Sequence, residues 1–195
     1  MLHQGLVENI IMRLRITAGY LKGRYINVPK SDLVRPTTER VRETIFNILN
    51  NKISFDNIKV LDLYSGSGAL GFECLSRGAS EVHFVEMNSV IYRTLAENIN
   101  QLQAEDRCQI FKMPAIKFSS LKANDSYDLI LADPPFFKND IYNVVANILD
   151  NKYLRSDCLM IIERSVQTKQ QDIDNFKLEP FKIIGDACLY EITYS

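Results

Sequence analysis

The chain has 195 residues, a length that fits one globular domain with at most a small appendage. Hydrophobic residues make up 46% of it and charged residues 24%, values that argue against a disordered chain and against a membrane protein. The net charge of -1 hides an asymmetry, because residues 1–52 hold nine basic and four acidic residues, a balance of +5 that leaves -6 for the remainder. A basic segment on an acidic body predicts contact with a polyanion, although an ordinary solvated surface would give the same count.

Cysteines, histidines and apolar runs argue against further classes. The four cysteines are far apart without a CxxC pair, so we expect reduced, mostly buried thiols instead of a disulfide framework. His3 and His83 are isolated, which predicts that the chain holds no metal site. No apolar run approaches the ~20 residues of a membrane-spanning helix, and no signal peptide is evident. These patterns predict a cytoplasmic protein without a membrane partner.

Residues 13–28 alternate between apolar and polar side chains. Apolar residues at 14, 16 and 18 fall on one face, and Arg13 and Arg15 fall on the other. A turn bounded by Gly19 and Gly23 separates this run from apolar residues 26 and 28, so the segment predicts a β-hairpin with a basic exposed face. Such a hairpin needs a surface to pack on or a partner to bind.

The stretch RPTTERVRETIFNIL changes to a helical period. Pro36 disfavours a helical conformation at Arg35, and either of the two following threonines can cap a helix that begins there. Apolar residues at 41, 45, 48 and 49 form one stripe along that helix. Arg35, Arg40 and Arg42 are expected to cluster around its start and flank.

After residue 59, short apolar strands alternate with helical patterns. The expected strands are Val60–Tyr64, Glu81–Val85, Gln109–Lys112, Leu129–Ala132 and Leu159–Glu163. The expected helices lie around Ala69–Ser76, Val90–Gln101 and Ile141–Leu149. This alternation predicts an α/β fold in which helices cover both faces of a mostly parallel sheet. The last apolar runs, FKIIG and CLYEITY, have no clear helix between them and predict a final hairpin with an antiparallel strand.

The first site motif is VLDLYSGSGALG at residues 60–71, where a strand runs into a glycine turn and then a helix. Glycine lets a ligand approach the main chain closely, and a helix start offers unpaired N–H groups. Gly66, Gly68 and Gly71 match GxGxxG, and Glu86, at the end of the next strand, can accept both hydroxyl hydrogens of a ribose. The motif predicts a nucleoside site, with a plain strand-to-helix turn as the structural alternative.

Asp62 favours one nucleoside over another. A dinucleotide site receives a pyrophosphate anion, which a neighbouring carboxylate would repel. S-adenosylmethionine carries a sulfonium and an ammonium group, which a carboxylate attracts. The DxxxGxG arrangement therefore favours S-adenosylmethionine over NAD, although the spacing alone does not separate the two.

The second site motif is DPPF at residues 133–136, directly after the strand expected beside the first one. Two prolines fix φ and remove backbone donors, so the carbonyls point outward instead of into a sheet ladder. Asp133 and the Pro134 carbonyl are then two fixed acceptors for the hydrogens of an exocyclic base amine, and Phe136 offers a face for stacking. The structural alternative is a proline-stopped strand with a core phenylalanine.

With these motifs in place, the sequence resembles the RsmD family of bacterial 16S rRNA guanine-N2 methyltransferases over nearly the whole chain from Met12. RITAGYLKGRYINVP, LVRPTTERVRETIFNIL, LDLYSGSGALGFECLSRGA and DPPF are similar to the family's hairpin, Arg-Pro-Thr helix, cofactor loop and catalytic motif. The resemblance implies a Rossmann-like class I S-adenosylmethionine-dependent methyltransferase fold. We expect residues 1–34 to form an extension with the basic hairpin and residues 35–195 to form the methyltransferase domain. The implied target is a guanine N2 in 16S rRNA, at the equivalent of guanine 966.

The resemblance also implies which residues form the site. The cofactor set is Asp62, Tyr64, Ser65, Gly66, Gly68, Glu86 and Met87. The stretch FKMPAIKF after the third strand adds Ala115 as an apolar contact to adenine, with a plain loop as the structural alternative. The catalytic set is Asp133, Pro134, Pro135 and Phe136. The set implied for rRNA phosphates is Arg13, Arg15, Lys22, Arg24, Arg35 and Arg40. Pro114 departs from the family pattern, which often has Asp or Asn there, so a backbone contact would replace a side-chain hydrogen bond to adenine.

Other functions share some of these features. A DNA adenine or cytosine amino-methyltransferase would use the same loop and a similar tetrapeptide, but 195 residues leave little room for its target-recognition region. A non-catalytic RNA-binding protein on this scaffold would be marked by loss of Asp62, Glu86 or Asp133, and all three are present. An NAD oxidoreductase is disfavoured by Asp62. We expect a monomer that acts on 16S rRNA in the assembling or assembled small ribosomal subunit.

Overall fold

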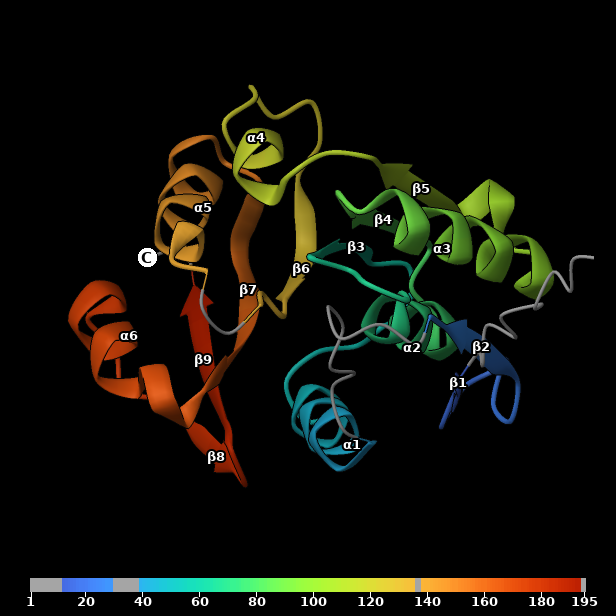
Figure 1. Ribbon diagram of the computed structural model, residues 1–195, viewed down its shortest axis with the longest axis horizontal. Helices are drawn as coiled ribbons and strands as arrows, with labels where there is room; N and C mark the ends of the chain where they lie inside the picture. The colour runs from blue at the N-terminus through green and yellow to red at the C-terminus, as the bar shows by residue number, and fades with distance from the viewer. Residues whose placement is uncertain (1–11, 30–38, 136–137, 194–195) are drawn as a thin grey trace, which may run out of the picture.

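The computed structural model describes residues 12–29, 39–135 and 138–193. Within these ranges a seven-stranded sheet has the order β5-β4-β3-β6-β7-β9-β8, and β1 pairs with β2 separately (Figure 1). The strands of the large sheet are, across it, β5 (Cys108–Phe111), β4 (Glu81–Val85), β3 (Lys59–Leu63), β6 (Tyr127–Ala132), β7 (Leu154–Ser165), β9 (Ala187–Thr193) and β8 (Lys182–Ile184). The helices are α1 (Glu39–Leu49), α2 (Ala69–Arg77), α3 (Ser89–Leu102), α4 (Ala115–Ser119), α5 (Asp140–Asp150) and α6 (Lys169–Phe176), with short 3₁₀ helices η1 (Glu105–Arg107) and η2 (Val166–Thr168).

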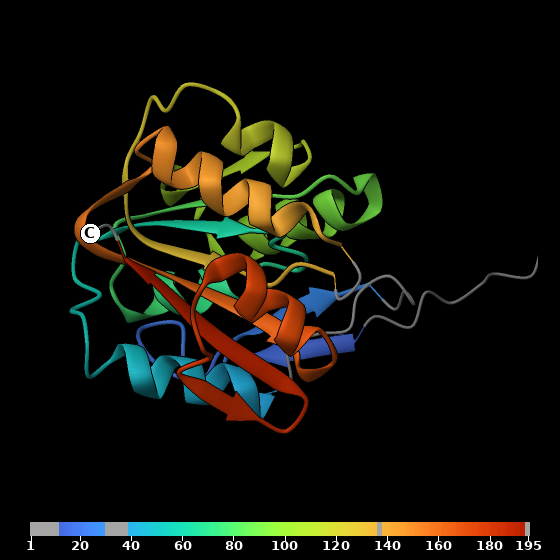
Figure 2. The same ribbon diagram turned by 90° about the vertical axis from the view of Figure 1, so that its left-hand side faces the viewer.

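Helices cover both faces of the large sheet, as the alternating pattern predicted. Val60 of β3 packs in the buried cluster with α1, α2 and α3, and its neighbour Leu61 packs in the opposite cluster with α4 and α5. Figure 2 shows the sheet between α5 on one side and α1 on the other. Because successive strand residues point to opposite faces, a strand buried on both faces reads as a continuous apolar run.

The pairing directions confirm a mostly parallel sheet with an antiparallel end. Strands β5, β4, β3, β6 and β7 are parallel, and β9 runs antiparallel to both β7 and β8. The final hairpin predicted from FKIIG and CLYEITY is therefore confirmed. The sequence analysis did not predict α4 or α6. Helix α4 has only five residues, and α6 buries Asp172 instead of a continuous apolar stripe.

The chain reverses its direction of travel across the sheet between β3 and β6. From β3 it moves outward through β4 to β5, and β6 then returns to the other side of β3. Leu63 of β3 and Ala132 of β6 are register partners, so the segments that follow these two strands leave the same edge side by side. This is the topological switch point at which open α/β sheets bind ligands.

The predicted N-terminal hairpin is confirmed, and it packs on α2 and α3. Strand β1 (Met12–Arg15) pairs with β2 (Tyr25–Val28). The Glu73 carboxylate of α2 accepts hydrogen bonds from the Thr17 amide at 3.0 Å, the Thr17 hydroxyl at 2.6 Å and the Ala18 amide at 3.0 Å. The Asn98 side chain of α3 bonds both the amide and the carbonyl of Asn27, at 2.8 and 2.9 Å. Buried polar contacts of this kind fix the hairpin in one orientation on the two helices.

Helix α1 has the predicted apolar stripe, with Val41, Ile45 and Leu49 buried together with Phe46. Its expected capping threonines lie outside the described residues. Arg42, which was expected to join a basic cluster, is instead buried and donates a hydrogen bond to the Arg15 carbonyl at 3.0 Å. Within the three described ranges, every helix is too short or too polar to cross a bilayer.

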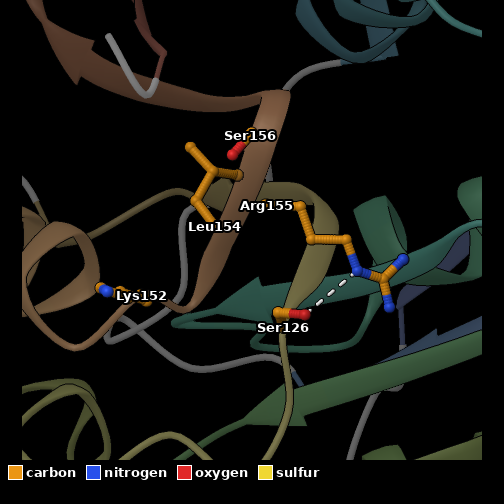
Figure 3. A pocket seen from close by; sticks show the side chains of 5 residues that line it. All are labelled: Ser126, Lys152, Leu154, Arg155 and Ser156. Carbon is orange, nitrogen blue, oxygen red and sulfur yellow. Dashed lines mark hydrogen bonds between the residues drawn. The ribbon is translucent and has the colours of Figure 1, made fainter.

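The opposite, amino-terminal edge of the sheet contains a cavity of about 550 Å³. Its lining residues come from the segments before β6 and before β7 and from the start of β7: Ser126, Lys152, Leu154, Arg155 and Ser156 (Figure 3). The Arg155 guanidinium bonds the Ser126 hydroxyl at 3.1 Å and pairs with the Asp128 carboxylate at 2.5 Å. The charge of Arg155 is therefore already balanced, and none of the predicted site residues lies here.

Candidate active site

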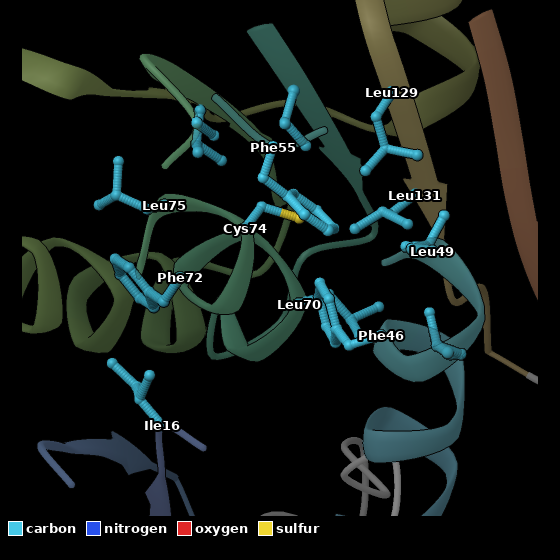
Figure 4. Close-up of a cluster of buried hydrophobic side chains, with 14 of the residues drawn as sticks. Ile16, Phe46, Leu49, Phe55, Leu70, Phe72, Cys74, Leu75, Leu129 and Leu131 are labelled. Atoms are coloured by element: carbon cyan, nitrogen blue, oxygen red, sulfur yellow. The ribbon is translucent and has the colours of Figure 1, made fainter. Parts of the chain in front are cut away.

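The glycine turn begins where β3 ends and leads directly into α2. Tyr64, Gly66 and Gly68 all have positive φ, at 57°, 53° and 83°, which makes the turn tight. A Cβ at Gly68 would lie 2.6 Å from Leu95 Cδ1 and 2.6 Å from Phe72 Cε2, so the position requires glycine for space as well as for φ. Phe72 lies in the buried cluster of Figure 4, which anchors the helix that follows the turn.

Ser65 and Glu86 join the glycine turn to the end of β4. The Ser65 amide donates to the Val85 carbonyl at 3.1 Å, and the Ser65 hydroxyl donates to the same oxygen at 3.3 Å. The Glu86 carboxylate accepts from the Gly66 amide at 3.1 Å and from the Asn88 amide at 2.6 Å. Each carboxylate oxygen can accept more than one hydrogen bond, so Glu86 is oriented by the main chain and can still accept from a ribose.

Asp62 lies beneath this turn and is almost completely buried, with 1% of its surface exposed. Its carboxylate accepts a hydrogen bond from the Gly71 amide in the first turn of α2 at 2.9 Å. Burial raises the pKa of the Asp62 carboxyl well above its usual range, and the Gly71 amide lowers it. The nearby charges of Asp133 and Glu86 raise this pKa further.

Three carboxylates thus converge at the carboxyl ends of adjacent strands: Asp62 in β3, Glu86 after β4 and Asp133 after β6. Like charges at close range in a poorly solvated site repel one another, so a bound cation relieves the repulsion. The sulfonium and ammonium groups of S-adenosylmethionine meet that requirement, whereas a pyrophosphate would add to it. The residues present therefore fit this cofactor.

The double-proline turn starts beside the glycine turn. Asp133 is half-buried, Pro134 is buried and Pro135 is exposed, and the Lys138 amide closes the turn by donating to the Pro135 carbonyl at 2.9 Å. The Lys138 ammonium group also lies 3.5 Å from the Met87 sulfur, directly after Glu86. The segment after β6 therefore reaches the segment after β4, across the end of β3 that lies between them. Phe136, predicted to stack on a base, lies outside the described residues.

The segment after β5 has the features of an apolar wall. Pro114 precedes the first residue of α4, and Ala115 is buried in the cluster that contains Phe118. Met113 is half-buried, and its amide donates to the Phe111 carbonyl at 3.0 Å. The Ala115 side chain therefore packs in the core, so a ligand bound here would contact the backbone and Met113.

The residues predicted to bind RNA are spread along the hairpin and α1. Arg13, Arg15, Lys22 and Arg40 are exposed, whereas Arg35 lies outside the described residues. Arg24 differs from these, because its guanidinium donates to the carbonyls of Gln101 and Leu102 at the end of α3, at 2.5 and 3.3 Å. A cation there interacts favourably with the helix C-terminus, so Arg24 also helps to attach the hairpin.

Comparison with known proteins decides the family. A family model described as "Conserved hypothetical protein 95" matches residues 14–193. "Ribosomal RNA small subunit methyltransferase D" of Escherichia coli (strain K12) is 33% identical over 176 residues, which cover 90% of this chain and 87% of that protein. The chain belongs to the RsmD family. The protein of the same name from Haemophilus influenzae is also 33% identical, over 174 residues that cover 88% of this chain and 89% of the relative.

A solved structure supports the same family and fold. The "putative methyltransferase yhhF from Escherichia coli" is 30% identical, with a TM-score of 0.78 over 94% of this chain and all of that one (100%). The predicted Rossmann-like methyltransferase fold is therefore confirmed for this RsmD-family chain. The described residues contain no group of three or more His, Cys, Asp and Glu side chains that could hold a metal ion.

Sequence reasoning missed one group of residues beside the RsmD-family motifs. Arg164 of β7 and Asp172 of α6 form an ion pair at 3.0 Å, and both side chains have 0% of their surface exposed. The Arg164 guanidinium also reaches the Lys138 carbonyl, at 3.5 Å. No spacing in the sequence marks this group, although an arginine inside the apolar run LMIIERS is an unusual residue for a buried strand.

Proposed function

We propose that this protein transfers a methyl group from S-adenosylmethionine to the exocyclic N2 of a guanine in 16S rRNA. The observation that carries the proposal is that the glycine turn and the double-proline turn leave the register-paired ends of β3 and β6 side by side. The relatives named ribosomal RNA small subunit methyltransferase D support an rRNA substrate. The proposed nucleotide is the equivalent of guanine 966 in the small subunit.

In this proposal the ends of β3, β4 and β5 each bind a different part of the cofactor. Asp62 and the backbone of the glycine turn, from Tyr64 to Gly68, hold the cationic methionine part. Glu86 accepts from the ribose hydroxyls, while Met87 and the segment around Ala115 border the adenine. Bound S-adenosylmethionine supplies a methyl group that is activated by the positive charge on its sulfur.

The double-proline turn prepares the target nitrogen. The lone pair of the guanine N2 is conjugated with the ring, so the free amine is a poor nucleophile. Asp133 and the Pro134 carbonyl accept its two hydrogens and favour a pyramidal nitrogen, whose lone pair then points toward the methyl carbon. Both acceptors also stabilise the positive charge that develops on this nitrogen. The proton becomes acidic only as the new bond forms and then passes to the Asp133 carboxylate that accepts its hydrogen bond, so no base has to remove it first.

Positioning supplies much of the remaining rate enhancement. Pro135 stiffens the turn, and Phe136 stacks on the flipped base. The exposed cations Arg13, Arg15, Lys22 and Arg40, with Arg24 and Arg35, hold rRNA phosphates. We propose that residues 1–34 serve as the RNA-binding extension of a methyltransferase domain formed by residues 35–195, and that the protein acts as a monomer in the cytoplasm.

One assay tests the function. The protein and labelled S-adenosylmethionine are incubated with unmodified small subunits, with free 16S rRNA and with DNA, and the methylated nucleoside is identified by chromatography. N2-methylguanosine in rRNA is the expected product. N6-methyladenine or a methylated cytosine in DNA would instead identify a DNA amino-methyltransferase, and cofactor binding without any product would indicate a non-catalytic RNA-binding protein.

A further inference from the structure

Arg164 is a fully buried cation next to the proposed methyl-transfer site. It lies near the carboxyl end of β7, the strand adjacent to β6, and none of its side chain is exposed. A buried guanidinium loses its hydration, and a buried ion pair is weak evidence for stability because an apolar pair of similar size often does as well. Stability alone therefore does not account for the placement of its contacts.

The nitrogens of Arg164 face different parts of the fold. Nε donates to the Asp172 carboxylate in α6 at 3.0 Å, and Nη1 donates to the Lys138 carbonyl at a long 3.5 Å. Nη2 is buried and has no hydrogen-bond partner among the described residues. Lys138 in turn donates its amide to the Pro135 carbonyl at 2.9 Å, so two successive hydrogen bonds connect Arg164 with the double-proline turn.

Asp172 is held in place from three sides. One of its oxygens accepts from Arg164 and from the Tyr142 hydroxyl of α5, at 3.0 and 2.8 Å, and the other accepts from the Thr168 hydroxyl at 2.7 Å. The Arg164 guanidinium carbon also lies 6.0 Å from the centre of the Tyr142 ring, on its face. This network orients the guanidinium, because a planar fork held at Nε leaves the two terminal nitrogens in fixed directions.

The same guanidinium acts on the cofactor side of the site. Burial raises the pKa of the Tyr64 hydroxyl, the Asp140 carboxylate raises it further, and the charge of Arg164 lowers it. The Tyr64 hydroxyl oxygen and one Asp140 carboxylate oxygen are both buried and lie close enough to interact. Tyr64 begins the glycine turn, so the charge of Arg164 acts on the residue with which the cofactor turn starts.

We propose that Arg164 is the positioning residue of the double-proline turn: its guanidinium holds the Lys138 carbonyl, and through Lys138 it holds the turn that carries Asp133 and the Pro134 carbonyl at a fixed place beside the cofactor turn. The proposal rests on the proposed function for its activity readout. Asp172 supports this role, because its hydrogen bond to Nε fixes the direction of the Arg164 guanidinium. Arg164 itself does not touch the base or the cofactor.

Arg164→Lys is the most informative variant. A lysine keeps the charge and can pair with Asp172, but one ammonium group cannot also hold the Lys138 carbonyl in the same geometry. We expect kcat to fall by about 10- to 100-fold, because displacing a catalytic group by ~1 Å causes a loss of this size. KM for RNA and the affinity for S-adenosylmethionine should stay within about 3-fold of wild type. Arg155→Lys is the matched control, since Arg155 lies on the same strand, pairs with Asp128 and lies at the other edge. It should leave kcat unchanged.

Hydrogen exchange gives a readout that does not depend on activity. The Lys138 amide is protected by the Pro135 carbonyl, so peptides that contain this amide should exchange faster in Arg164→Lys than in wild type, and at the wild-type rate in Arg155→Lys. In Arg164→Ala, millimolar guanidinium should restore part of kcat, and urea at the same concentration should not. If Arg164→Ala does not fold, the lysine variant decides the question.

Several outcomes would overturn the proposal. Wild-type kcat together with wild-type exchange at Lys138 in Arg164→Lys would remove the positioning role. A loss of activity that only follows a lower melting temperature or weaker cofactor binding would assign Arg164 to stability. If wild-type protein methylates no RNA, the proposed function fails, whereas faster exchange at Lys138 in Arg164→Lys would still support the link to the turn.

Discussion

Alanine at Gly68 should destabilise the glycine turn through two separate effects. The φ of 83° is in the left-handed region, where a residue with a side chain loses about 1–2 kcal/mol. A Cβ there would also lie 2.6 Å from both Leu95 Cδ1 and Phe72 Cε2, in a core where overpacking typically costs about 1–3 kcal/mol. We therefore expect Gly68→Ala to lower the free energy of unfolding by about 2–5 kcal/mol and to weaken binding of S-adenosylmethionine.

Two other glycines separate these effects. Gly23 has a φ of 86°, but a Cβ there would meet nothing within 4 Å, so Gly23→Ala tests backbone strain alone. Gly71 lies in α2 and its Cβ would come within 2.3 Å of Phe84 Cε1, so Gly71→Ala tests crowding without a positive φ. Urea unfolding of the three variants, with calorimetric titration of the cofactor, makes the comparison. A Gly68→Ala protein as stable as Gly23→Ala would refute the reasoning.

Three further predictions concern catalysis, RNA binding and pH. Asp133→Ala should lower kcat by at least about 100-fold while cofactor affinity, measured by calorimetry, survives; near-normal turnover would remove Asp133 from the mechanism. The double variant Arg13→Ala/Arg15→Ala should flatten the dependence of log RNA affinity on log salt by about 1.5, and an unchanged slope would place the RNA elsewhere. Burial lowers the pKa of His83 from its ordinary 6.5, so the unfolded chain binds a proton more readily than the folded chain. The stability that is present above pH 6.5 is therefore lost as the pH falls from 6.5 through the pKa of His83 in the folded chain. Urea unfolding between pH 7.5 and 5 should therefore show a smaller decline in His83→Gln, and equal declines would contradict the assignment.

The parts of the fold that the sequence predicted are those set by local pattern. Strand β4 was predicted with the observed bounds, because an apolar run between two helical patterns has few other interpretations in an α/β chain. The glycine turn was predictable since Gly66 and Gly68 need no partner distant in the sequence to adopt positive φ. Strand β7 is longer than expected, because its first part is exposed and carries no apolar pattern.

The rest depends on contacts between residues that no spacing connects. Arg42 was expected at the surface but is buried, and the guanidinium groups of Arg24 and Arg42 bond carbonyls at the end of α3 and in β1. The role of Arg164 could not be read either, because Lys138 and Asp172 come near it only after β6, β7 and α6 have packed. A charge in a sequence shows that a group is ionisable, and only the fold shows which partner it has.

The attachment of the hairpin by Glu73 and Asn98 has a consequence for target choice. An arm on a flexible tether would let the catalytic centre search many nucleotides around its anchor point, whereas this arm shares buried polar contacts with the two helices that flank the cofactor turn. The distance from the hairpin to Asp133 is therefore fixed. Under the proposed function, an RNA bound to the hairpin would present to Asp133 the base at that one distance, so distance as well as sequence would select the methylated nucleotide.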